Sequence, residues 1–178
     1  MRSPERDDES SRSRGPVQID TLSEAASRFS KGTTPWLLGI SMSLAWAARL
    51  YWARWSWWDI GMAIAVIGLW PILEWLIHVV ILHFKPKEWF GIEFDMHVAH
   101  KHRLHHQDPW RIEHVWIPLR TLIVSLAIGP PVFLAIWSLM LPLSIGLTGL
   151  ATFLTFALVY EWAHFLVHTG YTPKSDWY

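Results

Sequence analysis

The sequence predicts an all-α integral membrane protein with four transmembrane helices and a cytosolic cap rich in histidine. Three observations predict this fold. Of the 178 residues, 52% are hydrophobic and only 17% are charged, which is too apolar for an ordinary soluble domain. Four long apolar segments alternate with polar ones. The ten histidines fall almost entirely into three groups, each where an apolar segment meets a polar one.

The N-terminal residues 1–34 are polar and poor in aromatic side chains, so they cannot bury enough surface to fold alone. We expect a disordered tail here, followed by one membrane domain over residues 35–178. Within the tail, Thr21 and Glu24 have the spacing of a helix capping box, with apolar residues at helical spacing around them. A short amphipathic helix lying on the bilayer is therefore the alternative for this stretch.

The four apolar segments are residues 36–52, 60–82, 119–137 and 142–167. At about 1.5 Å per residue each can cross about 30 Å of hydrocarbon, the first only just. Few residues join the last two segments, which predicts a tight hairpin, and Pro130-Pro131 should kink or break the third helix. The alternative is a pair of re-entrant pieces. Several of the 14 tryptophans flank these segments, as in an interfacial aromatic belt.

Charge predicts the orientation and excludes some classes of function. If the tail is cytoplasmic, the opposite side of the membrane holds only Arg49 and Arg54, so both termini and all histidine groups are expected to be cytoplasmic. Basic and acidic residues balance at 15 each, which does not favour a nucleic-acid partner. There is no cysteine, so any metal must take nitrogen or oxygen ligands.

The first histidine group ends the second apolar segment. Glu74 and His78 are one helical turn apart, so we expect the Glu74 carboxylate to orient the His78 ring. His78 and His83 differ by about 140° around an α-helix, so they either face different metals or require a distorted helix end. Two hydrated interfacial histidines are the alternative.

The second group contains His97, His100, His102, His105 and His106. If the segment is helical, His102 and His106 share a face and His105 lies about 60° to one side. So compact a set of ring nitrogens favours metal coordination over the alternative, a basic or pH-sensing cluster.

The third group places Glu161, His164 and His168 on one helical stripe, with Thr169-Gly170 as the end of the helix. Soluble di-iron carboxylate bundles use the same Glu-x2-His spacing, but they need more glutamates than this chain offers on facing helices. We therefore expect the two histidines to be metal ligands and Glu161 to have a supporting or structural role. A packed histidine pair is the alternative.

Together the three groups resemble successive histidine boxes of the fatty acid hydroxylase/sterol desaturase superfamily in order, spacing and flanking residues. The matching strings are Glu74-Trp-Leu-Ile-His78-x4-His83-Phe-Lys-Pro86, His102-x2-His105-His106-x2-Pro109 and Tyr160-Glu-Trp-Ala-His164-x3-His168-x-Gly170. The first string is also similar to carotenoid hydroxylases of that superfamily. The longer stretch between the first two boxes is closer to the fatty acid 2-hydroxylase pattern.

The resemblance implies an integral membrane oxidoreductase in which clustered histidines hold two iron ions that activate O2. By position it implies the ligands His78, His83, His102, His105, His106, His164 and His168. The position of His97 is one residue from that of a further box histidine, whereas His100 and His114 match no box position.

The implied reaction is hydroxylation or desaturation of a lipid, whether fatty acyl, sterol or carotenoid. Nitrogen ligands without soft donors suit iron that binds O2. The substrate is expected to enter laterally from the bilayer. The chain has no flavin or nicotinamide fingerprint, so electrons are expected from cytochrome b5 or ferredoxin with a reductase.

The given sequence departs from the family pattern in one respect. The pattern ends with a further His-x2-His-His box, which would follow a segment like residues 171–178, and the given sequence does not contain it. Either the chain is truncated, or a partner supplies the box, or His97, His100 and His114 substitute for it. The alternative function is therefore a truncated, catalytically inactive histidine-box membrane protein with a scaffold or binding role. A metal transporter is a third possibility, but its ligands would be expected at mid-membrane.

Overall fold

The computed structural model describes residues 15–173, and most of them are helical. Within this part of the chain, three helical stretches are long and apolar enough to cross a membrane: Trp57–Leu82, Ile112–Ser138 and Leu143–Val167. They correspond to three of the four predicted spans. The other predicted span lies in α2 (Thr33–Tyr51), which is not among the three.

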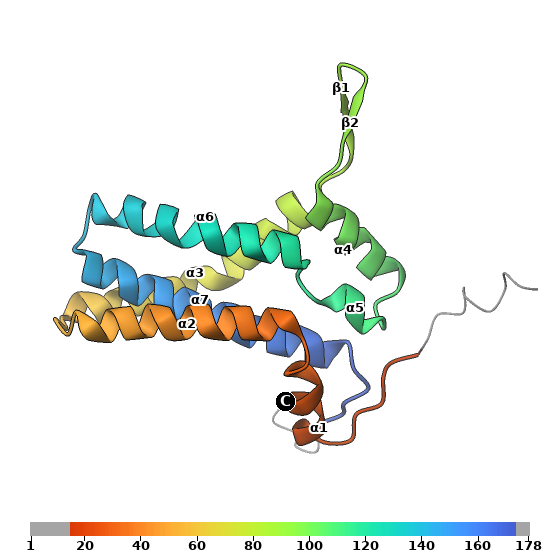
Figure 1. Cartoon of the computed structure of the whole chain (residues 1–178), viewed down its shortest axis with the longest axis horizontal. Coiled ribbons are helices and arrows are strands. Elements are labelled where there is room, and N and C mark those ends of the chain that lie inside the picture. Colours follow the sequence, from red (N-terminus) through yellow and green to blue (C-terminus); the bar gives the residue numbers. More distant parts are fainter. Residues whose placement is uncertain (1–14, 174–178) are drawn as a thin grey trace, which may run out of the picture.

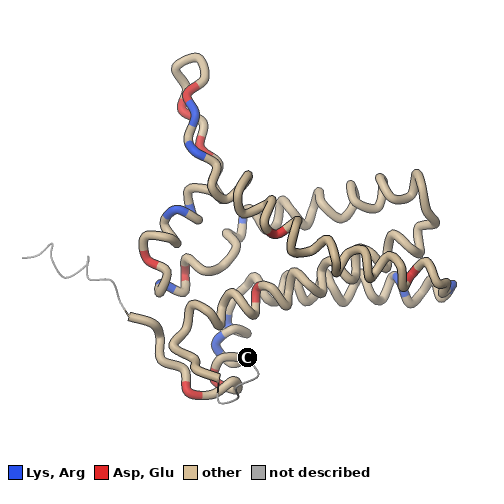
Figure 2. The backbone as a smooth tube through the Cα atoms, turned by 180° about the vertical axis from the view of Figure 1, so that it is seen from behind, with Lys and Arg blue, Asp and Glu red and all other residues tan. Residues whose placement is uncertain are grey.

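The long helices form a bundle with α7 (Leu143–Val167) at its centre, in contact with α2, α3 (Trp57–Leu76) and α6 (Leu119–Ser138) (Figure 1). Small residues along the first half of α7 are buried, and Ala151 is fully enclosed in a cluster with Ala45, Leu150 and Leu154. Most side chains of α3 and α6 are exposed and apolar. Figure 2 shows charged residues gathered mainly at the two ends of the bundle, which suits an apolar environment around its middle.

A buried ion pair links the helices at the end of the bundle that lies away from the histidines. Arg49 of α2 is fully buried and donates to Asp59 Oδ1 of α3 through Nε at 3.1 Å and Nη2 at 2.7 Å. Thr148 of α7 donates to the same oxygen at 2.6 Å. Asp59 also completes a capping box with Ser56 at the start of α3. One carboxylate therefore joins three helices.

The prediction of a disordered tail is wrong for residues 15–34. They include α1 (Leu22–Phe29), and the predicted cap is confirmed because Thr21 Oγ1 accepts a hydrogen bond from the Glu24 backbone at 3.1 Å. The remaining tail residues, 1–14, lie outside the described residues.

This N-terminal segment is held by the end of α7. Gly170 donates a backbone hydrogen bond to the Val17 carbonyl at 2.8 Å, and Ile19 is buried beside Phe165. Phe29 packs on the Trp116 and Trp162 rings. The segment is too polar to fold alone, but tertiary contacts with these aromatic side chains supply the buried surface that it lacks.

The two prolines do not interrupt α6, which is continuous from Leu119 to Ser138. The predicted break at Pro130-Pro131 is therefore wrong. Proline is tolerated in membrane-type helices because neighbouring groups and small local adjustments satisfy the freed carbonyls. Four residues, 139–142, connect α6 to α7, and the two helices pack together, which confirms the predicted hairpin.

The segment between α3 and α6 forms a cap over one end of the bundle (Figure 1). It begins with η1 (Ile77–Leu82), a π-helical continuation of α3. A β-hairpin follows, made of β1 (Lys87–Trp89) and β2 (Ile92–Phe94), and then α4 (His97–Gln107) and α5 (Ile112–Val115). The all-α prediction missed the hairpin, whose strands are only three residues long.

Candidate metal centre

Four histidines from two segments meet where η1 faces α4. They are His78, His83, His102 and His106, and each offers one ring nitrogen within 4.8 Å of the other three. His78 Nε2 lies 3.0 Å from His83 Nε2, and His102 Nε2 lies 3.0 Å from His106 Nε2. We call this set the four-histidine group. It offers four converging nitrogens, a donor set that suits one transition-metal ion.

The π-helix explains why His78 and His83 face the same point. The His83 backbone N–H donates to the His78 carbonyl at 3.1 Å, five residues earlier, instead of to the residue four earlier. The wider turn brings positions five apart onto one face, whereas an α-helix would separate them by about 140°. Of the two alternatives left by the sequence, the distorted helix end is confirmed, and the two rings do not face different sites.

A second group of histidines joins α4 to the end of α7. His105, His164 and His168 each offer one ring nitrogen, and these nitrogens lie within 4.8 Å of one another. The His105 ring centroid is 4.4 Å from that of His168 and 5.3 Å from that of His164. His105 is buried, with 5% of its surface exposed. We call this set the three-histidine group, and a metal held there would keep a position open for a further ligand.

Helix α4 makes the two groups neighbours. It crosses the end of the bundle (Figure 1) and gives His102 and His106 to one group and His105 to the other. The His105 ring centroid is 5.9 Å from that of His102 and 5.9 Å from that of His106. The sideways offset that the helical spacing predicts for His105 thus turns its ring to the second group. All seven histidines named by the resemblance fall in these two groups.

Close packing keeps the rings neutral. The pKa of His102 is lowered to about 3, mainly by burial and secondly by the neighbouring histidine rings, of which His106 has the largest effect. Burial, followed by the ring of His168, lowers the pKa of His105 to about 4. The pKa of His168 is also lowered, mainly by burial, against an opposing contact with the Pro109 backbone. At neutral pH these rings therefore keep a lone pair that can bind a metal.

Three other histidines stay outside both groups. His97 is exposed at the first turn of α4, and His100 Nδ1 lies 3.4 Å from Asp95 Oδ2. His114 lies in α5 with a buried Nδ1 that has no hydrogen-bond partner. Among the described residues, the suggested substitution of these three for a missing box receives no support from the geometry.

Of the two predicted supporting glutamates, Glu74 lacks the expected contact and Glu161 has a structural one. Among the described residues, no hydrogen bond joins Glu74 to His78. Glu161 is buried, and its Oε1 accepts from the Ile117 backbone N–H at 3.2 Å, while Oε2 has no partner. Glu161 therefore fixes α7 to the segment before α6, which corresponds to the structural role that the sequence left open.

A positioning contact that the sequence did not reveal fixes α4 to the end of η1. Arg103 donates to the Phe84 carbonyl at 2.9 Å and forms an ion pair with Asp95. These two contacts hold the residues that follow η1 against α4. Helical spacing does not predict the ion pair, because Asp95 precedes the helix that carries Arg103.

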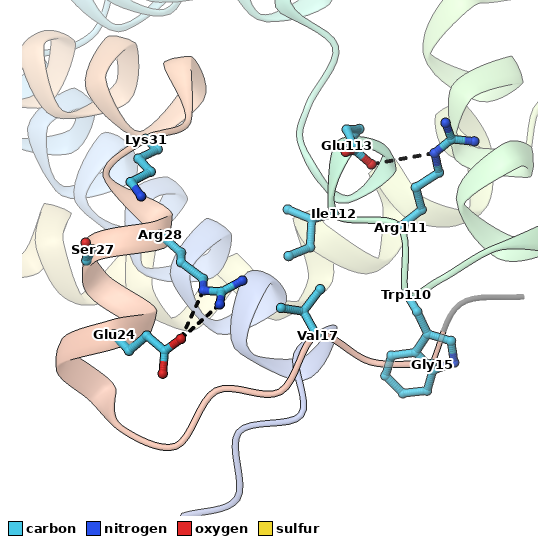
Figure 3. A pocket seen from close by; sticks show the side chains of 10 residues that line it. All are labelled: Gly15, Val17, Glu24, Ser27, Arg28, Lys31, Trp110, Arg111, Ile112 and Glu113. Atoms are coloured by element: carbon cyan, nitrogen blue, oxygen red, sulfur yellow. Dashed lines mark hydrogen bonds and ion pairs between the residues drawn. The ribbon is translucent and has the colours of Figure 1, made fainter.

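A groove lies away from the histidines, between α1 and α5 (Figure 3), with a volume of about 590 Å³. Two ion pairs, Arg28 with Glu24 at 2.9 Å and Arg111 with Glu113 at 3.5 Å, line it. No histidine lines this groove, so it is separate from the two histidine groups.

Comparison of the chain with protein-family models, curated proteins and solved structures finds no match.

Proposed function

We propose that this chain is a membrane-bound di-iron oxidoreductase that hydroxylates or desaturates a lipid with O2, most like a fatty acid hydroxylase. The observation that carries the proposal is the meeting of seven histidines, from three distant parts of the chain, in two adjacent nitrogen-only groups. These are the histidines that the family pattern selects by position.

The donor set fits iron. The four-histidine group would hold one ion and the three-histidine group the other, all through neutral imidazole nitrogens. Bound iron would supply the activation of O2 and the removal of hydrogen from an unactivated C–H bond. The chain's own contribution is to converge the rings, to keep them unprotonated and to shield the three-histidine group from water through the burial of His105.

The four-histidine group is the more accessible one. His83 and His106 are exposed, and apolar side chains such as Val79, Val80 and Ile81 cover the outer surface of η1 next to them. A lipid chain moving along that surface reaches the histidines without leaving an apolar environment. Electrons would come from cytochrome b5 or ferredoxin with a reductase, docked on the cap.

We also propose α2 as a fourth span, with both termini and the histidine groups on the cytoplasmic side. The charge of Arg49 near its end does not oppose this, because the guanidinium is buried against Asp59 instead of facing lipid. The excess of basic residues at the histidine end supports a cytoplasmic cap made of η1, the hairpin, α4 and α5.

A second candidate is an inactive histidine-box protein with a scaffold or binding role. The observation that favours it is that the three-histidine group offers one nitrogen fewer than its neighbour, as expected if the last box of the family is needed. Such a protein would keep the helices but bind its second metal weakly and turn over no substrate.

The test is lipid analysis combined with iron analysis. The chain is expressed in a host membrane, purified into lipid nanodiscs and supplied with iron, O2 and a reduced electron donor, and lipid products are measured by mass spectrometry. His106→Ala is expected to lower both bound iron and lipid oxidation, whereas His100→Ala, on the same helix but outside both groups, changes neither. Undiminished oxidation by His106→Ala would refute the ligand assignment. If the parent chain binds iron but forms neither a hydroxylated nor a desaturated lipid, the scaffold role is favoured.

A further inference from the structure

The β-hairpin of β1 and β2 projects sideways from the cap and pairs with no other described strand (Figure 1). All six strand residues are exposed. The two central turn residues, Phe90 and Gly91, have φ of 53° and 75°, as in the tightest hairpin turns. An isolated two-stranded hairpin is marginally stable in water, so this one is expected to lie against something else.

The strand register gives the hairpin two unlike faces. Trp89 pairs with Ile92 and Lys87 with Phe94, while Glu88 pairs with Glu93. Because alternate side chains of a strand point to opposite faces, the aromatic and aliphatic side chains share one face and the two carboxylates occupy the other. Trp89, Ile92 and Phe94 are 69%, 71% and 54% exposed. The hairpin is therefore an amphipathic ribbon with an uncovered apolar face.

The apolar face is continuous with the outer surface of a membrane-type helix. The hairpin begins five residues after Leu82, the last residue of the apolar stretch Trp57–Leu82. The Phe84 ring, at the exit of that stretch, packs on the Phe94 ring with 6.0 Å between centroids. Lys87 Nζ lies 5.3 Å from the centre of the same Phe84 ring, so a cationic group sits where the ribbon leaves the helix.

The direction of the ribbon suits a membrane surface. Figures 1 and 2 show it running roughly perpendicular to the long helices, beside the end of the bundle that carries the histidine groups. If the helices cross the bilayer, a ribbon perpendicular to them at that end runs along the plane of the bilayer surface. Tryptophan and phenylalanine with neighbouring lysines are the residues that favour the boundary between lipid headgroups and acyl chains.

We propose that the hairpin Lys87–Phe94 is an interfacial membrane anchor, with Trp89, Ile92 and Phe94 among the lipids and Glu88 and Glu93 toward water. A lipid surface fits better than a protein partner because the apolar face continues the exposed surface of η1 through Phe84. The hairpin also connects η1 to α4, the two segments that form the four-histidine group. Anchoring it holds α4 at the bilayer surface, and this holds whether or not the groups bind iron.

The absence of cysteine allows a direct test by spin labelling. Ile92→Cys and Glu93→Cys place a nitroxide label on neighbouring residues of opposite faces, and Phe90→Cys places one at the tip. In nanodiscs of phosphatidylcholine with phosphatidylglycerol, collision rates are measured with O2, which concentrates in lipid, and with a water-soluble nickel chelate. All three sites are exposed, so labelling leaves the packed helices unaltered.

The anchor predicts that the ratio of O2 to nickel collisions is several-fold higher at Ile92→Cys and Phe90→Cys than at Glu93→Cys. Equal ratios on the two faces would overturn it, because the apolar face would then not be the side of the ribbon that lies in lipid. Protection of the Ile92→Cys label from both reagents would also overturn it, because the face would then be covered by protein, either a second copy or another partner.

Discussion

The buried pair of Arg49 and Asp59 should make a large contribution to the stability of the bundle. Asp59→Asn keeps the size of the side chain but leaves the Arg49 guanidinium buried without a counter-charge. Removing one partner of such a pair costs about 3–5 kcal/mol. A change of 1 kcal/mol shifts the melting temperature of a chain of this length by about 2–4 °C, so we expect a decrease of roughly 6–20 °C.

The double variant Arg49→Met/Asp59→Leu tests the reason for that loss. Replacing both charges with apolar side chains is often neutral or stabilising, so the double variant should melt well above Asp59→Asn. It loses the capping box with Ser56, which costs about 1 kcal/mol.

Thermal unfolding in nanodiscs, followed by tryptophan fluorescence, measures these differences, and Arg54→Met, an exposed arginine nearby, is the matched control. A melting temperature of Asp59→Asn equal to that of the parent, or a double variant less stable than the single one, would refute the reasoning.

Three further predictions concern the histidine groups and the N-terminal segment. Iron titration should show one tight binding step and one weaker step, because the two groups offer four and three nitrogens. His105→Ala should abolish only the weaker step, and His100→Ala should abolish neither. Two equally tight steps in the parent protein would contradict this reasoning. In the metal-free protein the pKa of His102 is about 3 and that of His105 about 4, below the ordinary value of about 6.5. As the pH falls, the unfolded chain binds protons at these histidines before the folded protein does, so the free energy of unfolding is greatest above pH of about 6.5 and declines toward pH of about 4. Equal melting temperatures at these two pH values would exclude this. Phe165→Ala, at a side chain 1% exposed and stacked on Trp116 at 5.3 Å, should cost about 3–5 kcal/mol and release α1 to proteases, and unchanged protease resistance would show that α1 is held elsewhere.

The two histidine groups show how much local spacing can predict. The i, i+4 spacing of His102 and His106 predicted their common face, because an α-helix repeats nearly every four residues. The i, i+5 spacing of His78 and His83 left two alternatives, because the sequence does not state whether a helix widens into a π-turn. The structure decides for the π-turn, which turns both rings toward those of α4.

The expected role of Glu74 shows a limit of the same kind. One-turn spacing placed its carboxylate near His78, but whether a hydrogen bond forms depends on which way each side chain turns in its surroundings. Among the described residues that bond is absent, and Glu161 instead accepts from a backbone N–H 44 residues away in the chain. Contacts over such distances leave no periodic trace in the sequence.

The sequence by itself determined three long apolar helices and the hairpin between α6 and α7, because hydrophobic length is a local property of the chain. The set of seven histidines was selected by position from the resemblance to histidine-box proteins, and it stays a prediction. Only the tertiary structure decided that α4 lies across the end of the bundle and divides its histidines between two groups, and that residues 15–34 fold against α7. The physical reason is that both outcomes depend on surfaces brought together from distant segments. Their burial stabilises conformations that neither segment would keep alone.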